Sequence, residues 1–507
     1  MHEKLSYVLL VVLLLVLTLS LFGCDEGKGG PEPSGFFTHG IASGDVRDKE
    51  AILWTRVNQE AELIAEVSTD CTFTQVDKGK KGMALAENNF IVKVTVSNLE
   101  PGQTYCYRFK AGIATAVSDV GTFRTAPSED QDATVRFAYS SDSDGSEDPP
   151  FNNFEVLDQA LLDEIDFWIY LGDTVYTDTF GPKAETLDEM RAKYKQNRDF
   201  VALRDLLKTT STYAIWDDHE VENDFDGQAI DPTLYANGRE AFLEYMPVQE
   251  LGLLSDPDCA GDPLFRVFHW GKNVDIIILD ERSCRSADVE EVCEDDLAPT
   301  LPSEFRSAFG LPPLPSDCLD AINDPARTML GIVQKEALKN ALQESKATWR
   351  IIINEVAISE IFALPYDRWE GYAAERQELL NFIIDNKIKN VVFLTGDLHA
   401  NIIGDVRLNA FTALTPIAKE IIAGPIAQVT LFERLVDQLG SAEAVLLLMS
   451  LATLAKLQCV NTDTFGYALV EVDSDSLTIT LKDDKGQQIQ DQLERPGASC
   501  TITISAQ

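Results

Sequence analysis

The stretch Ala214-Ile-Trp-Asp-Asp-His-Glu-Val-Glu-Asn-Asp224 begins as an apolar run and ends in two adjacent aspartates, a histidine and a glutamate. A folded protein seldom places so many carboxylates at the end of an apolar run unless a cation holds them together. The alternative is a solvated helix start that Asp217 or Asp218 caps. Polar residues elsewhere in the chain are needed to separate these two interpretations.

Other short apolar segments end in polar residues in the same way. The strand-length runs are 134–139, 167–171, 274–280, 349–354 and 391–395, with helical patterns at 154–162 and 187–207. Strands alternating with helices predict an α/β domain, in which ligands gather outside the carboxyl ends of the strands. The recurrence of Asp, Asn or His after these runs therefore predicts one site built on strand-end loops.

The residues that these strand ends offer are mostly hard oxygen donors. They are Asp142, Asp144, Asp173, Tyr176, Asp217, Asp218, His219, Asn223, Asn354, Glu355, Asp397 and His399. With only five histidines in the chain, this donor set favours Ca²⁺, Mg²⁺, Mn²⁺ or Fe³⁺ over a His- and Cys-based zinc site. Two cations that share a carboxylate could clamp a phosphate and activate water, and a histidine that is not a ligand could protonate the leaving oxygen.

The segment before this domain has a β pattern. Strands are expected at 51–54, 61–67, 90–96 and 104–109, separated by Gly, Pro, Asn and Asp turns. A turn followed by a tyrosine-rich strand at 99–107 is typical of fibronectin-type sandwiches. We therefore expect a small immunoglobulin- or fibronectin-like β-sandwich over 36–126 and an α/β domain over 133–507.

The amino terminus has the pattern of an export signal. Lys4 precedes an uncharged run over 5–22, which meets Gly23 and Cys24. Residues 21–24 resemble a bacterial lipobox, although Phe22 is bulky for that motif and leaves an uncleaved anchor as the alternative. We expect a signal peptide over 1–24, a flexible tether over 25–35, and an exported protein tethered at a membrane of the cell envelope.

Charge and cysteine content set further bounds. Lysine and arginine total 42 against 83 aspartates and glutamates, a formal charge of −41, which argues against a general nucleic-acid binder. An anionic substrate is still compatible with this charge if cations make the site locally positive. Apart from Cys24 there are eight cysteines, and their order favours Cys71 with Cys106, Cys459 with Cys500, and two bridges within 259–318.

Three motifs carry a resemblance to a known family. Residues 171–176 (LGDTVY), 216–223 (WDDHEVEN) and 396–399 (GDLH) are similar to blocks of the PhoD-like alkaline phosphatases and phosphodiesterases, in the calcineurin-like metallophosphoesterase superfamily. Supporting similarities follow in the same order along the chain at 37–45, 52–56, 279–285, 330–335 and 369–376. The resemblance implies a metallophosphatase-type α/β sandwich.

The resemblance also implies roles for single residues. Asp173 would bridge two metals, His219 would be the general acid, and Tyr176 would be a phenolate ligand. Metal ligands would be Asp142, Asp173, Tyr176, Asp218, Asn223, Asp397 and His399, with Asp144, Asp217, Asn354 and Arg282 as supporting or substrate-contacting residues. The family usually has a cysteine where this chain has Asp142, which would make the site harder. The expected cofactors are two or more metal ions, Ca²⁺ with Fe³⁺ or another divalent metal.

These features together predict an exported metal-dependent phosphoesterase that hydrolyses phosphate mono- or diesters. The alternatives are a surface lipoprotein that binds calcium or polyanions without turnover, and a metal-dependent hydrolase of another ester. The apolar run 444–455 is too short to span a bilayer and is expected to form a buried helix.

Overall fold

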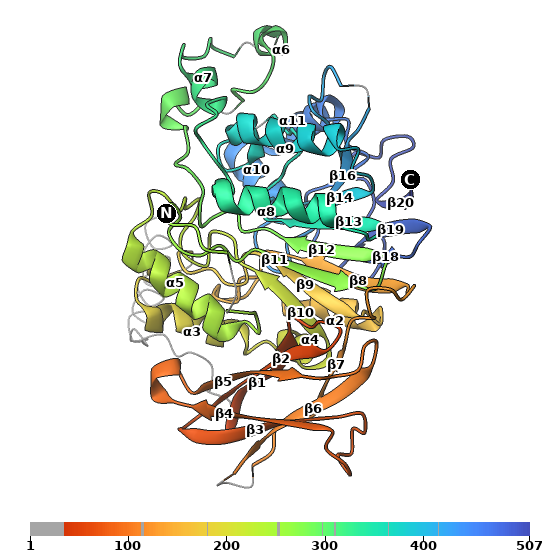
Figure 1. Cartoon of the computed structure of the whole chain (residues 1–507). Coiled ribbons are helices and arrows are strands. Elements are labelled where there is room, and N and C mark those ends of the chain that lie inside the picture. The colour runs from red at the N-terminus through yellow and green to blue at the C-terminus, as the bar shows by residue number, and fades with distance from the viewer. Residues whose placement is uncertain are drawn as a thin grey trace, which may run out of the picture.

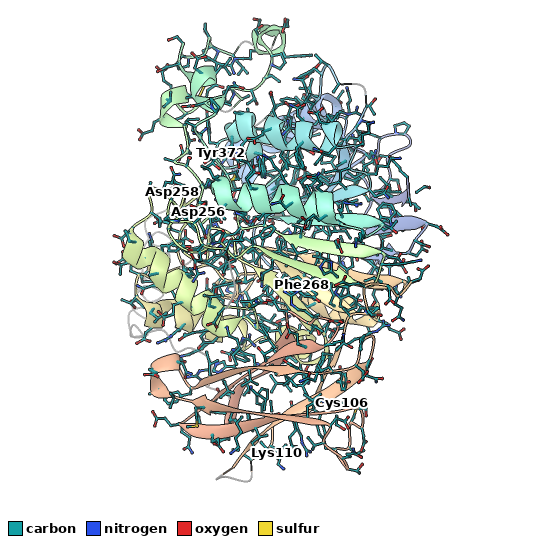
Figure 2. All side chains as sticks on the ribbon, viewed as in Figure 1. Cys106, Lys110, Asp256, Asp258, Phe268 and Tyr372 are labelled. Atoms are coloured by element: carbon teal, nitrogen blue, oxygen red, sulfur yellow. A yellow bond between two sulfur atoms is a disulfide. The ribbon has the colours of Figure 1, made fainter. Side chains whose placement is uncertain are left out.

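Two large β-sheets pack face to face between layers of helices, and a smaller sheet lies at one end (Figure 1). This computed structural model describes residues 35–507 except 113–115, 180, 251–253, 297, 309–310, 363–364 and 414. The ring of Phe268 of the second sheet (labelled in Figure 2) lies 4.5 Å, centroid to centroid, from the tilted ring of Tyr213 of the first, so the main core lies between the two sheets. The expected α/β sandwich is confirmed.

The first sheet has nine strands. In spatial order they are β20 (Thr501–Ser505), β19 (Ser476–Asp483), β18 (Gly466–Val472), β8 (Val135–Ser140), β9 (Phe167–Leu171), β10 (Ser211–Ile215), β1 (Phe37–Gly44), β2 (Glu50–Val57) and β5 (Ile91–Ser97). Strands β8, β9 and β10 run parallel, with Ser140 opposite Tyr170 and Leu171 opposite Ile215. Their carboxyl ends therefore meet at one edge.

The second sheet has seven strands. They are β11 (Arg266–Trp270), β12 (Val274–Ile278), β13 (Trp349–Asn354), β14 (Val391–Thr395), β16 (Ala418–Ile422), β15 (Asn401–Val406) and β17 (Cys459–Asn461). Strands β12, β13 and β14 are parallel, and Asn354 pairs with Thr395 at their carboxyl ends. The residues that follow β13 and β14 thus emerge beside each other.

Helices cover the outer faces of both sheets. On the second sheet lie α8 (Gly331–Glu344) and α9 (Ala373–Asp385), and on the first α2 (Glu155–Leu162) and α4 (Val201–Thr209). The other elements are α3 (Leu187–Asn197), α5 (Pro232–Tyr245), α6 (Ser303–Ala308), α7 (Cys318–Ile322), α10 (Leu431–Leu439), α11 (Ser441–Leu454) and the 3₁₀ turns η1 (Ala86–Asn88), η2 (Glu291–Cys293) and η3 (Trp369–Tyr372).

The amino-terminal sandwich shares a sheet with the rest of the molecule. A separate four-stranded sheet, β4 (Lys78–Ala84), β3 (Ala61–Ser68), β6 (Thr104–Ala111) and β7 (Gly121–Arg124), packs on β1, β2 and β5. Strand β1 in turn pairs in parallel with β10 at Gly44 and Thr212. The sequence pattern did not predict β1, β4 or β7, and the division into domains at 126–133 stays a prediction.

The predicted disulfides are confirmed. The structure has Cys71–Cys106, Cys259–Cys284, Cys293–Cys318 and Cys459–Cys500. Cys71–Cys106 and Cys459–Cys500 are the pairs that the sequence favours, and the structure supplies the pairing within 259–318, which the sequence left open.

The prediction for 444–455 is wrong in one respect. Helix α11 buries Ala444, Leu448 and Ala452, which are spaced four residues apart on one face. Leu446 and Met449 on the other face are 64% and 49% exposed. Composition alone suggested burial all round, but only one face of this helix meets the core. Within the described residues, no helix is long and apolar enough to cross a membrane, and the expected signal and tether at 1–34 lie outside them.

A buried ion pair joins the end of β1 in the first sheet to β11 in the second sheet. Asp45, just after β1, accepts two hydrogen bonds from Nη1 of Arg266 at 3.0 and 2.9 Å, and both side chains are at most 3% exposed. Removing one partner of a buried pair leaves an uncompensated charge. We therefore expect Asp45→Asn to lower the free energy of unfolding by about 3–5 kcal/mol, measured by thermal and denaturant unfolding.

The matched control is Asp48→Asn. Asp48 is partly exposed and forms an ion pair with the exposed Lys49 at 3.5 Å, so its replacement should change stability by less than about 0.5 kcal/mol. Equal effects of the two substitutions would contradict the role assigned to the Asp45 pair.

Candidate active site

The polar residues that follow β8, β9, β10 and β14 converge at the carboxyl ends of the two sheets. Asp142, Asp173, Asp397 and His399 all adopt left-handed backbone conformations, with φ of 60°, 48°, 62° and 50°. Non-glycine residues seldom adopt positive φ, and such strained positions concentrate at functional sites. The chain therefore turns sharply at these four positions after the strands.

One cluster contains Asp142, Asp173 and His399. One ligand atom from each residue lies within 4.8 Å of the others, and all three residues are buried. The Tyr176 hydroxyl lies 3.1 Å from Nε2 of His399. Asp142 receives a hydrogen bond from Ser141 on Oδ2, but its buried Oδ1 has no hydrogen-bond partner among the described residues and lies 3.8 Å from Nε2 of His399. A buried carboxylate oxygen without a donor suits a cation.

A second cluster contains Asp173, Asp218 and His219 within the same limit of 4.8 Å. Asp218 accepts hydrogen bonds from the backbone amides of His219 at 2.9 Å and Asp224 at 2.5 Å. Asp173 belongs to both clusters, and its Oδ1 accepts a hydrogen bond from the His219 amide at 3.2 Å. From this shared position Asp173 would be able to hold a cation in each cluster.

The clusters concentrate negative charge away from water. Burial, and then the neighbouring Asp218, Asp217 and Glu220, raise the pKa of Asp173 well above its usual value. Burial also raises the pKa of Asp142 to about 7 and, together with Asp173 and Asp142, the pKa of Tyr176. These groups cannot all be ionised together without positive charge between them. The donor set of carboxylates, one phenol and imidazole therefore fits hard cations.

His219 is held by a carboxylate that the sequence interpretation missed. Its Nδ1 lies 2.6 Å from Oδ1 of Asp178, whose Oδ2 accepts a hydrogen bond from the Asn223 amide at 2.6 Å. Burial alone would lower the pKa of His219, but Asp218 and Asp178 outweigh burial and raise this pKa to about 9. Asp178 thus fixes the ring through Nδ1 and favours its protonated form, and Nε2 is the nitrogen that Asp178 does not contact.

The pKa values of the two histidines are shifted in opposite directions. Burial, and then the positive charge of Arg434, lower the pKa of His399 well below its usual value. Nδ1 of His399 lies 2.5 Å from the Val429 carbonyl and therefore carries the proton, which leaves the Nε2 lone pair toward the first cluster. His399 has the form of a metal ligand, and His219 that of a proton donor.

Comparisons with known proteins agree with this geometry. The family model described as PhoD-like phosphatase matches residues 139–481, and the model of the amino-terminal domain of PhoD-like phosphatases matches residues 28–127. The chain belongs to the PhoD-like phosphatase family. Its members are phosphatases or phosphodiesterases, so the chain is an enzyme of this class.

Individual relatives extend this finding. Alkaline phosphatase D of Bacillus subtilis (strain 168) is 28% identical over 425 residues, which are 75% of this chain and 67% of that protein. The solved structure of PhoD matches 93% of this chain and 95% of that chain, with 22% identity and a TM-score of 0.74. Purple acid phosphatase PPD1 from yellow lupin seeds covers 92% of this chain and 73% of its own, with 13% identity and a TM-score of 0.55. These two structures show the fold.

Arg282 holds carboxylates beside the active site of this PhoD-like phosphatase in place. Its fully buried guanidinium contacts Asp217 through Nε, and Asp367 through Nη1 at 2.6 Å and Nη2 at 2.9 Å. A further contact of 3.9 Å reaches Oδ2 of Asp218. Because carboxylates already surround it, Arg282 positions the loop that carries Asp218 and is not available to a substrate.

The remaining predicted residues lie at the margins. Asp144 is hydrogen-bonded by Ser146, Thr179 and Gln428. The Asn354 side-chain oxygen accepts a bond from the Trp369 indole at 3.1 Å. Asn223 is exposed, and its side-chain amide contacts Asp224.

Asp397 is half-buried and stands outside both clusters. Burial, and then Asp367, raise its pKa. The structure therefore gathers Asp142, Asp173, Asp218, His219 and His399, with Tyr176 in contact.

Asp178 and Asp367 had weak signals in the sequence. Asp178 follows Tyr176 by two positions, and Asp367 stands just before the segment 369–376 that resembles a family block. A third group, Asp256 (labelled in Figure 2) with Cys259 and Cys284, is not a metal site because its two cysteines form a disulfide.

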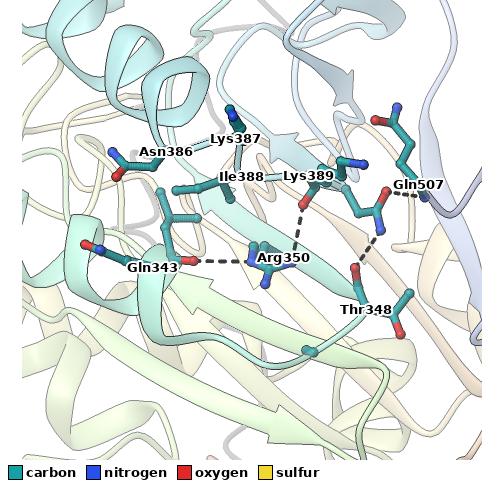
Figure 3. A pocket seen from close by; sticks show the side chains of 11 residues that line it. Gln343, Thr348, Arg350, Asn386, Lys387, Ile388, Lys389 and Gln507 are labelled. Atoms are coloured by element: carbon teal, nitrogen blue, oxygen red, sulfur yellow. Dashed lines mark hydrogen bonds between the residues drawn. The ribbon is translucent and has the colours of Figure 1, made fainter.

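A surface cavity of about 480 Å³ lies elsewhere (Figure 3). It is lined by Arg350, Lys387, Lys389 and Gln507, among others, near the amino ends of β13 and β14. Arg350 there donates to the carbonyls of Leu342, Ser345 and Lys389. The opposite ends of these two strands lead to the active site, so this cavity is not part of it.

Experiment can distinguish the roles of Asp142 and Asp144, the two aspartates that follow β8. We expect Asp142→Asn to reduce bound metal strongly, because it removes a charge that faces Asp173 and His399, whereas Asp144→Asn should keep the metal content of the wild type. Elemental analysis after dialysis, with calorimetric titration of the metal-free protein, measures both. Loss of metal in the Asp144 variant alone would reverse the assignment.

Proposed function

We propose that this protein is an exported, membrane-tethered phosphoesterase that uses two or more hard metal ions to hydrolyse phosphate esters outside the cytoplasm. One observation carries the proposal: Asp173 is shared by two cation-type clusters, and His219 is held beside it by Asp178. A protein that only binds ions has no use for a positioned proton donor. The proposed ligands are Asp142, Asp173, Tyr176, Asp218 and His399, with Asp397 close by and Asn223 at the rim.

The donor set guides the choice of metal. The usual thiolate of the family is replaced by Asp142, which favours a harder cation in the first cluster. We propose Ca²⁺ together with Fe³⁺ or another hard cation. Bound cations would neutralise the phosphate, lower the pKa of a water molecule and so supply the nucleophile.

The protein's own groups then have distinct tasks. Asp173 belongs to both clusters, while Arg282 and Asp367 keep the loop with Asp218 in place. Nε2 of His219 donates its proton to the leaving oxygen as the P–O bond breaks. Asp178 stabilises the imidazolium before transfer and keeps the ring in orientation.

Export is supported by two features. Four disulfides in the described residues suit an oxidising compartment, and the uncharged run 5–22 before Cys24 suits a signal with a lipid anchor. Fractionation of cells and mass spectrometry of the mature amino terminus test this part: a lipidated Cys24 is expected, and a soluble cytoplasmic protein with an intact Met1 would contradict it.

Hydrolysis of aryl phosphate mono- and diesters by the purified, metal-supplied protein tests the activity. Asp173→Asn should lower kcat/KM by at least about a thousandfold, because it alters both clusters at once. Chelation should abolish turnover, and readdition of metal should restore it. If neither ester is cleaved with any supplied metal, the proposed activity is wrong.

The role of His219 can be tested through the leaving group. His219→Ala should lower kcat about 10²- to 10⁴-fold for an alkyl phosphate, whose leaving oxygen needs a proton. The loss should be much smaller for 4-nitrophenyl phosphate, whose leaving group departs without one. Asp178→Asn should show the same dependence with a smaller loss. The alternative is that His219 is a metal ligand. Measuring the metal content of His219→Ala tests this, because loss of metal in the variant would show that His219 binds metal.

A further inference from the structure

Arg434 stands over the active site on a firmly anchored helix. Its Nη2 lies 3.4 Å from Nε2 of His399. The first turn of α10 is fixed to the same loop, because the Leu431 amide donates to the His399 carbonyl at 3.0 Å. Thr430 caps the helix through the Glu433 amide at 3.3 Å. The arginine therefore projects from a defined position and not from a free loop.

The guanidinium influences residues from several strand ends. Its positive charge adds to the effect of burial in lowering the pKa of His399, and it partly offsets the raised pKa values of Asp142, Tyr176 and His219. These four residues follow β8, β9, β10 and β14 in the sequence. The guanidinium lies beside the first cluster, where its Nη2 contacts His399.

Arg434 differs from the other arginines near the site in its partners. Arg282 and Arg285 are both fully buried and paired with Asp367. Arg434 is exposed at the rim and forms no ion pair with a carboxylate in the part of the chain that the structure describes. In a protein of net charge −41, an arginine left without a carboxylate beside an acidic site is available for an anion.

The contact with His399 leaves Arg434 able to bind an anion. Nδ1 of His399 lies 2.5 Å from the Val429 carbonyl, so Nε2 is the acceptor for Arg434. That lone pair is also the one that His399 would give to a cation. With a cation bound, the arginine loses its acceptor, and its planar fork of N–H donors can turn to phosphate oxygens, which it matches in geometry.

We propose that Arg434 binds a terminal oxygen of the substrate phosphoryl group and thereby favours phosphate monoesters over diesters. This inference rests on the proposed phosphoesterase function. A monoester has three terminal oxygens and up to two negative charges, whereas a diester has two terminal oxygens and one charge. If the two cation clusters bind two terminal oxygens, a monoester still offers a third oxygen to Arg434, whereas a diester does not.

The alternative is that Arg434 only positions His399. The two roles differ in what the substitution removes: a positioning residue would affect metal binding, and a phosphate ligand would affect anion binding. Variants Arg434→Ala and Arg434→Lys, each in the full metal-supplied protein, separate them. Lys485→Ala is the charge-matched control, because Lys485 is 79% exposed on the turn after β19.

Three measurements are needed: metal content, the dissociation constant of orthophosphate by calorimetry, and kcat/KM for 4-nitrophenyl phosphate and bis(4-nitrophenyl) phosphate. For Arg434→Ala we expect unchanged metal, a phosphate dissociation constant raised about tenfold or more, and kcat/KM for the monoester lowered about 10- to 100-fold. The diester value should fall no more than about threefold. Arg434→Lys should lie between, and Lys485→Ala should match the wild type.

Loss of metal in Arg434→Ala, unchanged phosphate affinity, or equal losses for both esters would each overturn the inference. Failure of the wider function is distinguishable, because then the wild type itself cleaves neither ester. The phosphate titration still reports on Arg434 in that case.

Discussion

The burial of several carboxylates at one point is the constraint on which the rest of this structure depends. Asp142, Asp173 and Asp218 lie within two overlapping clusters, out of contact with water and beside Asp217 and Glu220. Isolated buried charges of one sign are costly unless counter-charges are supplied. Arg282 supplies part of this charge from inside the protein, and the unpartnered Oδ1 of Asp142 shows where more is needed.

The fold brings these charges together through its two parallel strand groups. Strands β8, β9 and β10 end side by side in one sheet, and β13 and β14 end side by side in the other. Left-handed residues directly after the strands turn the chain over the sheet edge. Hydrogen bonds behind the site then fix the loops, as Glu220 does by accepting bonds from Thr174 and the Asp217 amide. Position is thus set by packing and backbone geometry before any ligand binds.

The sequence predicted the strand ends and most of the site because each apolar run carries its polar residue directly after it. Asp173, Asp218, His219 and His399 come together as the parallel arrangement requires. Asp178, Asp367 and Arg434 were missed because they act on other residues across loops, and no periodicity encodes such contacts. Asn223 lies in the same motif as Asp218, but a turn leaves it exposed at the rim. Motif membership therefore does not fix the direction of a side chain.

The same limit applies to the fold. Strand β1 joins the amino-terminal sandwich to β10, a pairing 168 positions apart at Gly44 and Thr212 that local pattern cannot reveal. Helix α11 has an apolar composition on both faces, and only the tertiary structure decides which face is covered. Two disulfides, Cys71–Cys106 and Cys459–Cys500, were predicted because their cysteines are neighbours in the sequence, whereas the four cysteines within 259–318 allowed more than one pairing.

The central claim is that the site concentrates buried negative charge in order to hold cations. Thermal unfolding tests this claim most directly, with the wild type and Asp173→Asn each measured in chelator and with added metal. The account predicts that the variant is more stable than the wild type in chelator at alkaline pH, because it lacks one of the opposed charges. It also predicts that metal raises the melting temperature of the wild type far more than that of the variant. A wild type indifferent to metal, or a variant that is less stable in chelator, would contradict it.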